Sequence, residues 1–403
     1  MALPDWGDKL ASQINKRWGD GTAVVASSSS SRKLEAIPTG VFAIDVAIGI
    51  GGIPRGRISQ FIGKPSSCKT GVALKVVRSA QEMCRECFTT MPTTGEMLNR
   101  CRACGSTSAK SKKCASQTCE NALMELEAWP ARQCLTHGYM PMRVSWCDTE
   151  GVWDNAWAAG IGVNCDYVLI SQPDAGETAV EVVDMSLRSG DADLVVLDSF
   201  AHLTPTAEID GGADKMLMGT QARLSNKAMR KWVSSLNAMH RLPTLLVINQ
   251  IRMKIGVMYG DPETTPGGMG KEFASSLDIR MRRGKYHFVS AKGTDITTTD
   301  GSAAPIYADI HFLVKKNKVG APGKGGEFRF YLSNYEGRSI GDSDDGETIW
   351  AFAKKYGLVV SGDGKWTCGD LEAKTWKELK AMILVPVNQN RVRAELVAIM
   401  ARK

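Results

Sequence analysis

The sequence has no apolar run long enough to cross a membrane. A spanning helix needs about 18 or more consecutive apolar residues, and no stretch approaches that length. The segment from Met1 to Lys16 also lacks the apolar core and cleavage site of a secretion signal. We therefore expect a cytoplasmic protein with no membrane partner.

The chain has only 5 histidines but 11 cysteines, an odd number, and no export signal. Disulfides are therefore not expected. Seven of the cysteines fall between Cys84 and Cys134, and closely spaced pairs of this kind are typical of zinc sites. A first structural zinc is predicted at Cys84, Cys87, Cys101 and Cys104. A second would use Cys114, Cys119, Cys134 and His137. Residues 84–138 then form a zinc-binding insert that handles DNA, docks a partner or acts as a structural staple.

The net charge of +7 over 403 residues is compatible with a polyanionic partner but does not establish one. Apolar residues at helical spacing from Asp5 to Trp18 predict a short helix, which docks either on a neighbouring subunit or on its own domain. The serine run Ser27–Ser31 predicts a flexible joint. The expected organisation is an N-terminal helix and linker (1–33), a core (34–340) that contains the insert, and a small C-terminal domain (341–403).

The core shows strand and helix patterns in alternation. The helices are expected at Lys69–Ala80, Glu177–Arg188 and Leu217–Met239. The apolar strands are expected at Ile58–Gly63, Met142–Cys147, Tyr167–Ser171, Leu194–Leu197 and Leu245–Ile248. Buried strands alternating with helices predict an α/β fold with a mostly parallel sheet covered on both faces.

Residues 63–70 nearly match a phosphate-binding loop, G-x-x-x-x-G-K-[ST], between a strand and a helix. Such a loop directs backbone N–H groups and a helix N-terminus at the phosphates of a nucleotide. The site would comprise Gly63, Ser66, Ser67, Cys68, Lys69 and Thr70. Cys68 stands where a glycine is expected. If the backbone there is left-handed, the cysteine costs roughly 1–2 kcal/mol.

Two further strands end in acids. Asp198 follows Leu194–Leu197, and an acid in this place holds Mg²⁺ together with the loop hydroxyl of Thr70. Glu150 follows another apolar strand and could deprotonate an attacking water. Because the carboxyl ends of parallel strands share one edge of a sheet, these acids are expected beside the loop.

Several ordered blocks remain to be explained, and they include Glu35–Gly40, Gly51–Ile58, Ser171–Glu177, Ile248–Met258 and Val314–Lys318. In these blocks the chain resembles the RecA family of bacterial and phage DNA recombinases. The resemblance implies a RecA-type ATPase core with an N-terminal oligomerisation helix and a small C-terminal α/β domain. It covers residues 5–83 and 142–335, and the insert has no counterpart in it.

The resemblance implies a role for individual residues. Lys69 binds phosphate, Glu150 activates water, and Gln250 senses the γ-phosphate. Asp154 and Trp157 contact adenine. Lys316 and Lys318 reach the ATP of the neighbouring subunit. The implied cofactors are ATP and Mg²⁺, with structural Zn²⁺ added from the cysteine pattern.

Two segments resemble the family's DNA-binding loops and lack an obvious base-reading set, so binding is expected to be independent of sequence. The first segment contributes Met218, Gly219, Arg223, Asn226 and Arg230. The second contributes Arg252, Ile255, Gly256, Gly267 and Gly268. Arg282 and Arg283 resemble a second, weaker DNA site, or are simple surface charge.

These features predict a DNA-dependent ATPase that forms a homo-oligomeric helical filament on single-stranded DNA, pairs it with homologous double-stranded DNA and exchanges strands. One alternative is an accessory DNA-repair ATPase or translocase of the same fold. Another is an ATP-gated DNA-binding filament in which Cys68 has reduced hydrolysis.

Overall fold

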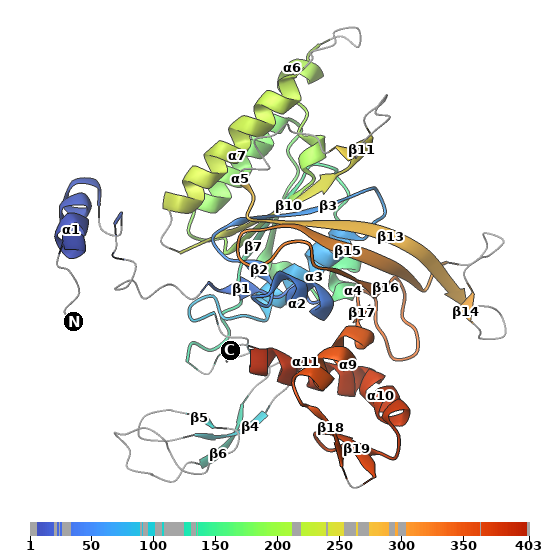
Figure 1. Cartoon of the computed structure of the whole chain (residues 1–403). Helices are drawn as coiled ribbons and strands as arrows, with labels where there is room; N and C mark the ends of the chain where they lie inside the picture. The colour runs from blue at the N-terminus through green and yellow to red at the C-terminus, as the bar shows by residue number, and fades with distance from the viewer. Residues whose placement is uncertain are drawn as a thin grey trace. The chain divides into compact units, whose positions relative to one another are not determined.

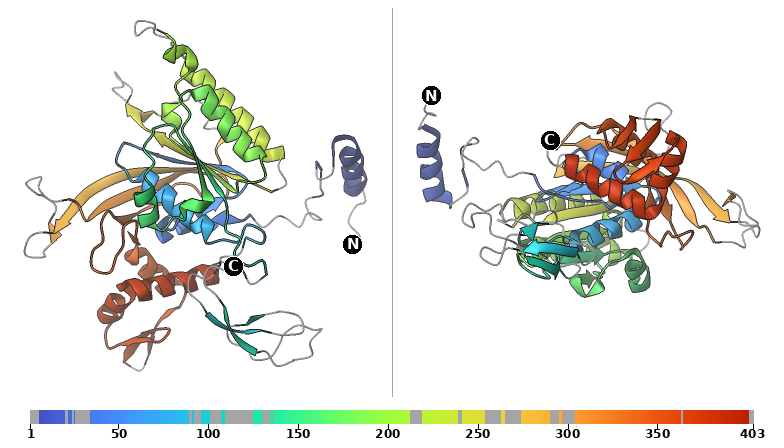
Figure 2. Two further views of the ribbon diagram at one scale, coloured as in Figure 1. Left: turned by 180° about the vertical axis from the view of Figure 1, so that it is seen from behind. Right: turned by 90° about the horizontal axis from the view of Figure 1, so that it is seen from below.

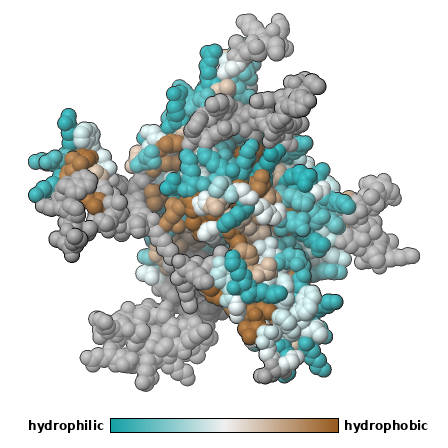
Figure 3. Space-filling model, viewed as in Figure 1, coloured by the Kyte–Doolittle hydropathy of each residue, from teal (hydrophilic) through white to brown (hydrophobic). Residues whose placement is uncertain are grey.

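The structure of the protein is a computed structural model that divides into two units, Met1–Glu35 and Ala36–Lys403. The first unit contains helix α1, Trp6–Trp18, which carries apolar side chains beside polar ones (Figure 3). Leu10 and Trp18 on it are exposed. The described residues are 6–19, 22–23, 25, 34–88, 91, 96–100, 107–108, 125–129, 134, 136–211, 219–238, 241–253, 263–264, 274–289, 295–296, 304–362 and 364–400.

The second unit is built around a ten-stranded sheet with the order β17-β16-β15-β13-β3-β10-β9-β7-β8, and β14 pairs with β13. The strands from β13 to β8 run parallel, and β15, β16 and β17 extend the sheet as antiparallel strands. The parallel strands are β13 (Leu277–Val289), β3 (Ile58–Gly63), β10 (Thr244–Gln250), β9 (Leu194–Asp198), β7 (Val144–Asp148) and β8 (Val168–Ser171). The others are β14 (Asp295–Ile296), β15 (Tyr307–Asn317), β16 (Gly325–Tyr331) and β17 (Ser343–Asp344).

Helices cover both faces of this sheet (Figures 1 and 2). On one face, α2 (Phe42–Ile48), α3 (Lys69–Gln81) and α4 (Asn155–Ile161) bury the largest apolar cluster. On the other, α5 (Gly176–Arg188) and α7 (Thr220–Ala238) pack with Trp232 and Phe200 into a second cluster. The predicted mostly parallel sheet with two helical layers is therefore confirmed.

Several short elements connect this framework. They are β1 (Ala36–Ile37) with β2 (Ile53–Pro54), the 3₁₀ turns η2 (Cys165–Tyr167) and η3 (Phe200–His202), α6 (Thr206–Ile209), and β11 (Arg252–Met253) with β12 (Glu263–Thr264). Within the insert, β4 (Glu96–Arg100), β5 (Thr107–Ser108) and β6 (Glu125–Trp129) form a separate antiparallel sheet.

The last part of the chain forms a small α/β module with its own apolar cluster. It contains α9 (Gly346–Lys355), β18 (Val359–Gly362), β19 (Lys365–Cys368), β20 (Leu371–Ala373), α10 (Trp376–Leu384) and α11 (Pro386–Met400). Phe42 of α2 belongs to the same cluster, so the module packs directly on the core. Asp345 strengthens this contact by accepting a hydrogen bond from the backbone N–H of Ala43 at 3.0 Å.

Candidate functional site

The loop between β3 and α3 has the backbone of a phosphate-binding loop. At Gly63, a Cβ would lie 2.4 Å from the carbonyl oxygen of Met281 and 2.5 Å from Oγ of Ser67, so only glycine fits. Cys68 has φ 60° and ψ 22°, which is the left-handed conformation that the glycine of the consensus motif would adopt without strain. The loop therefore keeps its shape despite the cysteine.

Lys69 lies folded over this loop. Its Nζ donates to the carbonyl oxygen of Lys64 at 2.7 Å and lies 3.3 Å from Oγ of Ser67. The side chain is largely buried, and this burial lowers the pKa of the ammonium, while the acids of the site oppose the shift. A buried cation above a helix N-terminus is a favourable place for phosphate oxygens.

Thr70 and Asp198 meet where α3 starts and β9 ends. The Thr70 hydroxyl donates to Oδ2 of Asp198 at 2.9 Å. Burial, with Glu150 nearby, raises the pKa of Asp198 to about 7. A buried carboxyl with neighbouring negative charge and an adjacent hydroxyl is a donor set that suits Mg²⁺, because a divalent cation would compensate both acids.

Glu150 lies just after β7 and is held by groups from two other strand ends. Its Oε1 accepts from Nε2 of Gln250 at 2.8 Å and from Oγ of Ser199 at 2.6 Å, and it lies 3.0 Å from Nδ1 of His202. The predicted convergence of the ends of β3, β7 and β9 is thus observed, and the end of β10, which carries Gln250, joins them. Neither Ser199 nor His202 was expected at the site. Ser199 directly follows β9, and His202 is brought to the acid by the 3₁₀ turn η3.

Asp148 fixes the turn that presents Glu150. Its carboxylate accepts the backbone N–H groups of Glu150, Gly151 and Trp153 at 3.2, 2.9 and 2.9 Å. The side chain of Gln172 donates to it as well, at 2.9 Å. Asp148 is therefore a positioning residue.

The predicted adenine pair lies at the same edge of the sheet. Asp154 caps α4, accepting the N–H groups of Ala156 and Trp157 at 2.7 and 3.0 Å. Asp154 and Trp157 line one small hollow together with Thr70 and Asp198. The structure thus brings this pair beside the phosphate loop.

Lys316 and Lys318 lie toward the opposite end of the strands. Lys316 pairs in register with Asp278, near the start of β13, and its Nζ donates to Oγ of Ser275 at 3.1 Å. The backbone N–H of Lys318 donates to the carbonyl oxygen of Ser276. Because β13 and β3 are parallel, both lysines lie away from the strand ends that carry this chain's own phosphate loop.

The described part of the predicted DNA-binding face lies on α7. Arg223 and Arg230 are exposed and Asn226 is half-buried on this helix, which Gly219 precedes with φ 84°. Arg252 belongs to β11. The remaining predicted residues of the two loops, Met218, Ile255, Gly256, Gly267 and Gly268, lie outside the described residues, as does the side chain of Arg252.

Arg282 and Arg283 do not form a common basic surface. As neighbours on β13 they point to opposite faces of the sheet. Arg283 donates to the hydroxyl of Tyr286 at 2.6 Å and stacks over its ring. Burial raises the pKa of the Cys68 thiol to about 11, and the positive charge of Arg283 partly opposes this shift. Arg282 is exposed.

Four potential metal ligands meet where the insert joins the core. The side-chain donors of Cys84, Cys87, Cys134 and His137 all lie within 4.8 Å of one another. Sγ of Cys87 is 3.5 Å from Sγ of Cys134, and Nδ1 of His137 is 3.5 Å from Sγ of Cys84. Tetrahedral zinc with Zn–S of ~2.3 Å and Zn–N of ~2.0 Å separates its ligands by roughly 3.5–3.8 Å, so the cluster fits zinc.

This grouping differs from the predicted one. The predicted first site combined Cys84 and Cys87 with Cys101 and Cys104, whereas the structure combines them with the last pair of the insert. The reason is that the chain leaves α3 and returns to β7 at the same place, so the two ends of the insert meet. Cys101, Cys104, Cys114 and Cys119 lie outside the described residues.

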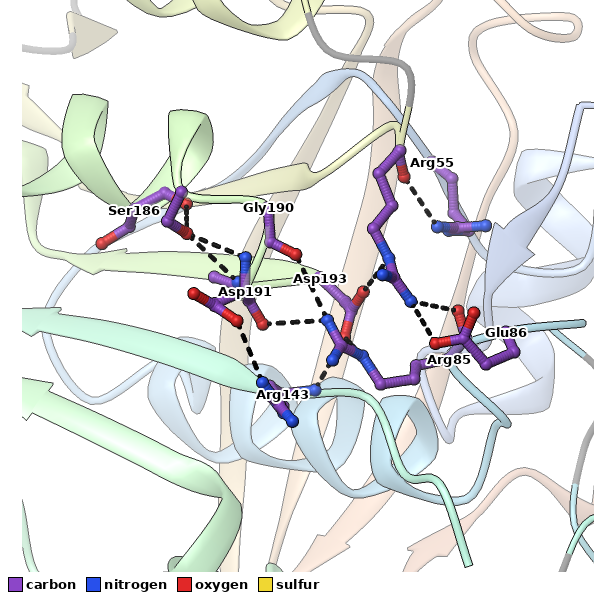
Figure 4. A network of polar contacts seen from close by, with 11 residues as sticks. Arg55, Arg85, Glu86, Arg143, Ser186, Gly190, Asp191 and Asp193 are labelled. Carbon is purple, nitrogen blue, oxygen red and sulfur yellow. Dashed lines mark hydrogen bonds and ion pairs between the residues drawn. The ribbon is translucent and has the colours of Figure 1, made fainter. Parts of the chain in front are cut away.

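One buried and one partly exposed ion pair attach the segment that follows Cys84 to the core, and Figure 4 shows the network to which they belong. Nε of Arg85 lies 3.0 Å from Oδ2 of Asp193, whose side chain is fully buried just before β9. Glu86 pairs with Arg241 at 2.6 Å, just before β10. The cluster is therefore bound to the amino ends of the parallel strands, and α3 connects it to the phosphate loop over 13 residues, or ~20 Å.

Comparisons with known proteins agree with this arrangement. The sequence model of the family described as RecA N-terminal domain matches residues 8–90 and 140–334, and the gap between these ranges corresponds to the insert. The relative "Protein RecA" of Saccharopolyspora erythraea is 36% identical over 81% of this chain and 75% of its own length. Those of Kineococcus radiotolerans and Streptomyces rimosus are 35% and 36% identical over 89% of this chain, and over 82% and 76% of their own lengths. The chain therefore belongs to the RecA family of DNA recombinases.

Proposed function

We propose that the protein is an ATP-dependent recombinase that forms a filament on single-stranded DNA and exchanges strands with a homologous duplex. The observation that carries this proposal is the contact between Glu150 and Gln250. Glu150 is the acid suited to activating water, and Gln250 immediately precedes the second predicted DNA-binding loop. A change at the nucleotide can thereby alter the DNA-binding loop.

In the proposed reaction, the loop N–H groups and Lys69 bind the phosphates of ATP. Glu150 takes a proton from water, the water oxygen bonds to the γ-phosphorus, and the bridging oxygen leaves with ADP. Mg²⁺, held by Thr70 and Asp198, would supply positive charge to the phosphate oxygens. Gln250 donates to the same Glu150 oxygen and so responds when that carboxylate moves.

The two distant lysines support assembly into a filament. Lys316 and Lys318 lie away from their own chain's phosphate loop, so we assign them to the ATP of the next subunit. There they would neutralise γ-phosphate charge and make subunit contact depend on ATP. A groove along edge strand β8, which exposes Leu169 and Met185, is a further surface that we assign to the contact with a second copy.

The surface of α7 supports contact with the DNA backbone. Two arginines with a spacing of seven residues, Arg223 and Arg230, share one face of the helix with Asn226 between them. Such a row binds phosphates irrespective of base sequence, and its affinity falls as salt rises. We propose that base pairing, not side-chain contact, supplies the specificity of this protein.

Cys68 favours a second candidate, an ATP-gated DNA filament with little hydrolysis. A side chain at this left-handed position brings a thiol into a loop where the family pattern has only hydrogen. If the thiol displaces the γ-phosphate from its reactive position, the protein still binds ATP and forms filaments on DNA, but it no longer hydrolyses ATP.

For the insert, we propose a structural zinc at Cys84, Cys87, Cys134 and His137. Burial alone would raise the pKa of the Cys134 thiol, but the backbone N–H groups of Thr136 and His137 lower it to about 6. Thiolate is the form that binds metal. Elemental analysis of the purified chain should therefore give zinc that decreases by one ion per chain in the Cys87→Ser variant.

Hydrolysis of ATP with and without single-stranded DNA tests the proposed reaction. The parent should show DNA-stimulated turnover that Glu150→Gln lowers about 100-fold or more, whereas the exposed control Glu372→Gln keeps it. Turnover unaffected by Glu150→Gln would remove the assigned base. If the parent binds DNA and ATP without hydrolysing ATP, and Cys68→Gly restores hydrolysis, the second candidate is established.

We propose that the protein acts in the cytoplasm. None of the described helices is long and apolar enough to span a membrane.

A further inference from the structure

A polar hollow of about 150 Å³ lies between α3 and the C-terminal module, separate from the nucleotide site. It has room for roughly five water molecules, which is enough for a small ion with some of its hydration. Its charged lining consists of four cations and two carboxylates: Lys75, Arg78, Arg338, Arg393, Glu82 and Asp342.

Lys75 projects from α3 into this region as a buried ammonium. Only 6% of the residue is exposed, and Nζ donates to the carbonyl oxygen of Gly341 at 2.7 Å. Among the described side chains, no carboxylate lies within ion-pair distance of it. Burial, reinforced by the positive charge of Arg393, lowers the pKa of Lys75 to about 8. A buried positive charge that only a carbonyl contacts is suited to an anion.

Arg393, from α11, also lines the hollow. One of its terminal nitrogens donates to Oδ1 of Asp345 at 2.7 Å, which holds the guanidinium in place. A guanidinium has five N–H donors, so its terminal nitrogens can donate to an oxygen acceptor in the hollow as well.

The two carboxylates of the lining are already engaged. Glu82 pairs with Nε of Arg78 at 3.1 Å, and Asp342 accepts the backbone N–H of Ser339 at 2.8 Å. Arg338 lies 3.7 Å from Asp344. Asp345 in turn pairs with Arg393 at 2.7 Å, so the three arginines each have a carboxylate partner. Lys75 is the cation of the described lining that has no carboxylate within ion-pair distance, and it is the one left to attract an anion.

We propose that this hollow binds a phosphate-like oxyanion, either free phosphate or the phosphoryl group of a small molecule. Its oxygens would accept from Lys75 and from the guanidinium of Arg393, in charge-assisted hydrogen bonds that are stronger than neutral ones. Because α3 also carries Lys69 and Thr70, the bound anion would join the helix of the phosphate loop to the C-terminal module. The proposal does not depend on the proposed function.

The test is thermal unfolding of the full chain saturated with Mg²⁺ and ADP, so that the phosphate loop is already filled. Inorganic phosphate or glycerol phosphate is added at constant ionic strength, with chloride as the reference. We expect the parent Tm to rise with phosphate and saturate, by roughly 3 °C at ten times the dissociation constant. A rise with phosphate alone assigns the free ion, and a rise with both assigns a phosphoryl group.

Three variants locate the effect. Lys75→Met, which keeps the side-chain length, and Arg393→Gln should each lose the phosphate-dependent rise whatever their starting Tm. Lys374→Met, at an exposed site on the same module, should keep it. The proposal is overturned if the parent shows no rise, or if both Lys75→Met and Arg393→Gln respond as the parent does.

Discussion

The left-handed conformation of Cys68 predicts that glycine at this position gives a more stable protein than alanine, which is the reverse of the usual order. At ordinary helix and strand positions, glycine is less stable than alanine by roughly 0.5–1 kcal/mol. At φ 60°, however, any Cβ costs roughly 1–2 kcal/mol, which glycine avoids. Against this, glycine gives up about 0.4–1 kcal/mol through the greater freedom of the unfolded chain. The Cys68→Gly variant should therefore be more stable than Cys68→Ala by about 1 kcal/mol.

Comparing these two variants cancels the loss of the thiol, since both lack it. Urea denaturation measures each free energy of unfolding, and equal m-values would show that the unfolded states are comparable. Cys147, buried in the extended strand β7, supplies the matched control. There, Cys147→Ala should be the more stable of the pair. If Cys68→Ala equals or exceeds Cys68→Gly in stability, the loop does not strain a side chain at this position.

Three further changes test other parts of the structure. Arg85→Ala leaves the buried carboxylate of Asp193 without its principal partner and should lower the free energy of unfolding by about 3–5 kcal/mol in urea denaturation. The control Arg143→Ala removes an exposed ion pair and should lower it by at most about 1 kcal/mol. Burial raises the pKa of Asp45 to about 7, so its contribution to stability is greatest below about pH 4 and declines, by up to about 4 kcal/mol, as the pH rises through 7. Asp45→Asn should flatten that decline, and an unchanged pH profile would refute the assignment. Thr70→Ala should raise the Mg²⁺ concentration needed for half-maximal ATP hydrolysis about tenfold, and an unchanged requirement would exclude the hydroxyl as a ligand.

The parallel half of the fold was predictable because its signals are local. Continuous apolar runs located β3, β9 and β10 to within about two residues, and the phosphate loop marked the start of α3 at Lys69. The antiparallel extension was not predicted. The parallel strand beside it, β13 (Leu277–Val289), was not predicted either. It alternates apolar residues with arginines because one face is partly exposed, and this weakens the apolar signal.

The sequence predicts a site residue only where that residue directly follows a recognisable strand, because the ends of parallel strands lie at one edge of the sheet. Asp198, which directly ends a strand, lies at the expected edge of the sheet, whereas Gln250 was expected near the nucleotide only from the family resemblance. His202 was missed because it approaches Glu150 through a 3₁₀ turn with no sequence signature. Cysteine spacing similarly identifies pairs that bind a metal, but which pairs combine depends on where the ends of the insert meet. That is a tertiary property of the chain.

Strand exchange between circular single-stranded DNA and a homologous linear duplex tests the central claim most directly. With ATP and Mg²⁺, the protein should convert the substrates into nicked circular duplex, and a duplex of unrelated sequence should give no product. Replacing both Lys316 and Lys318 with alanine should abolish product while each subunit still binds ATP. DNA-stimulated hydrolysis without homologous pairing would contradict the account and indicate an accessory ATPase or translocase.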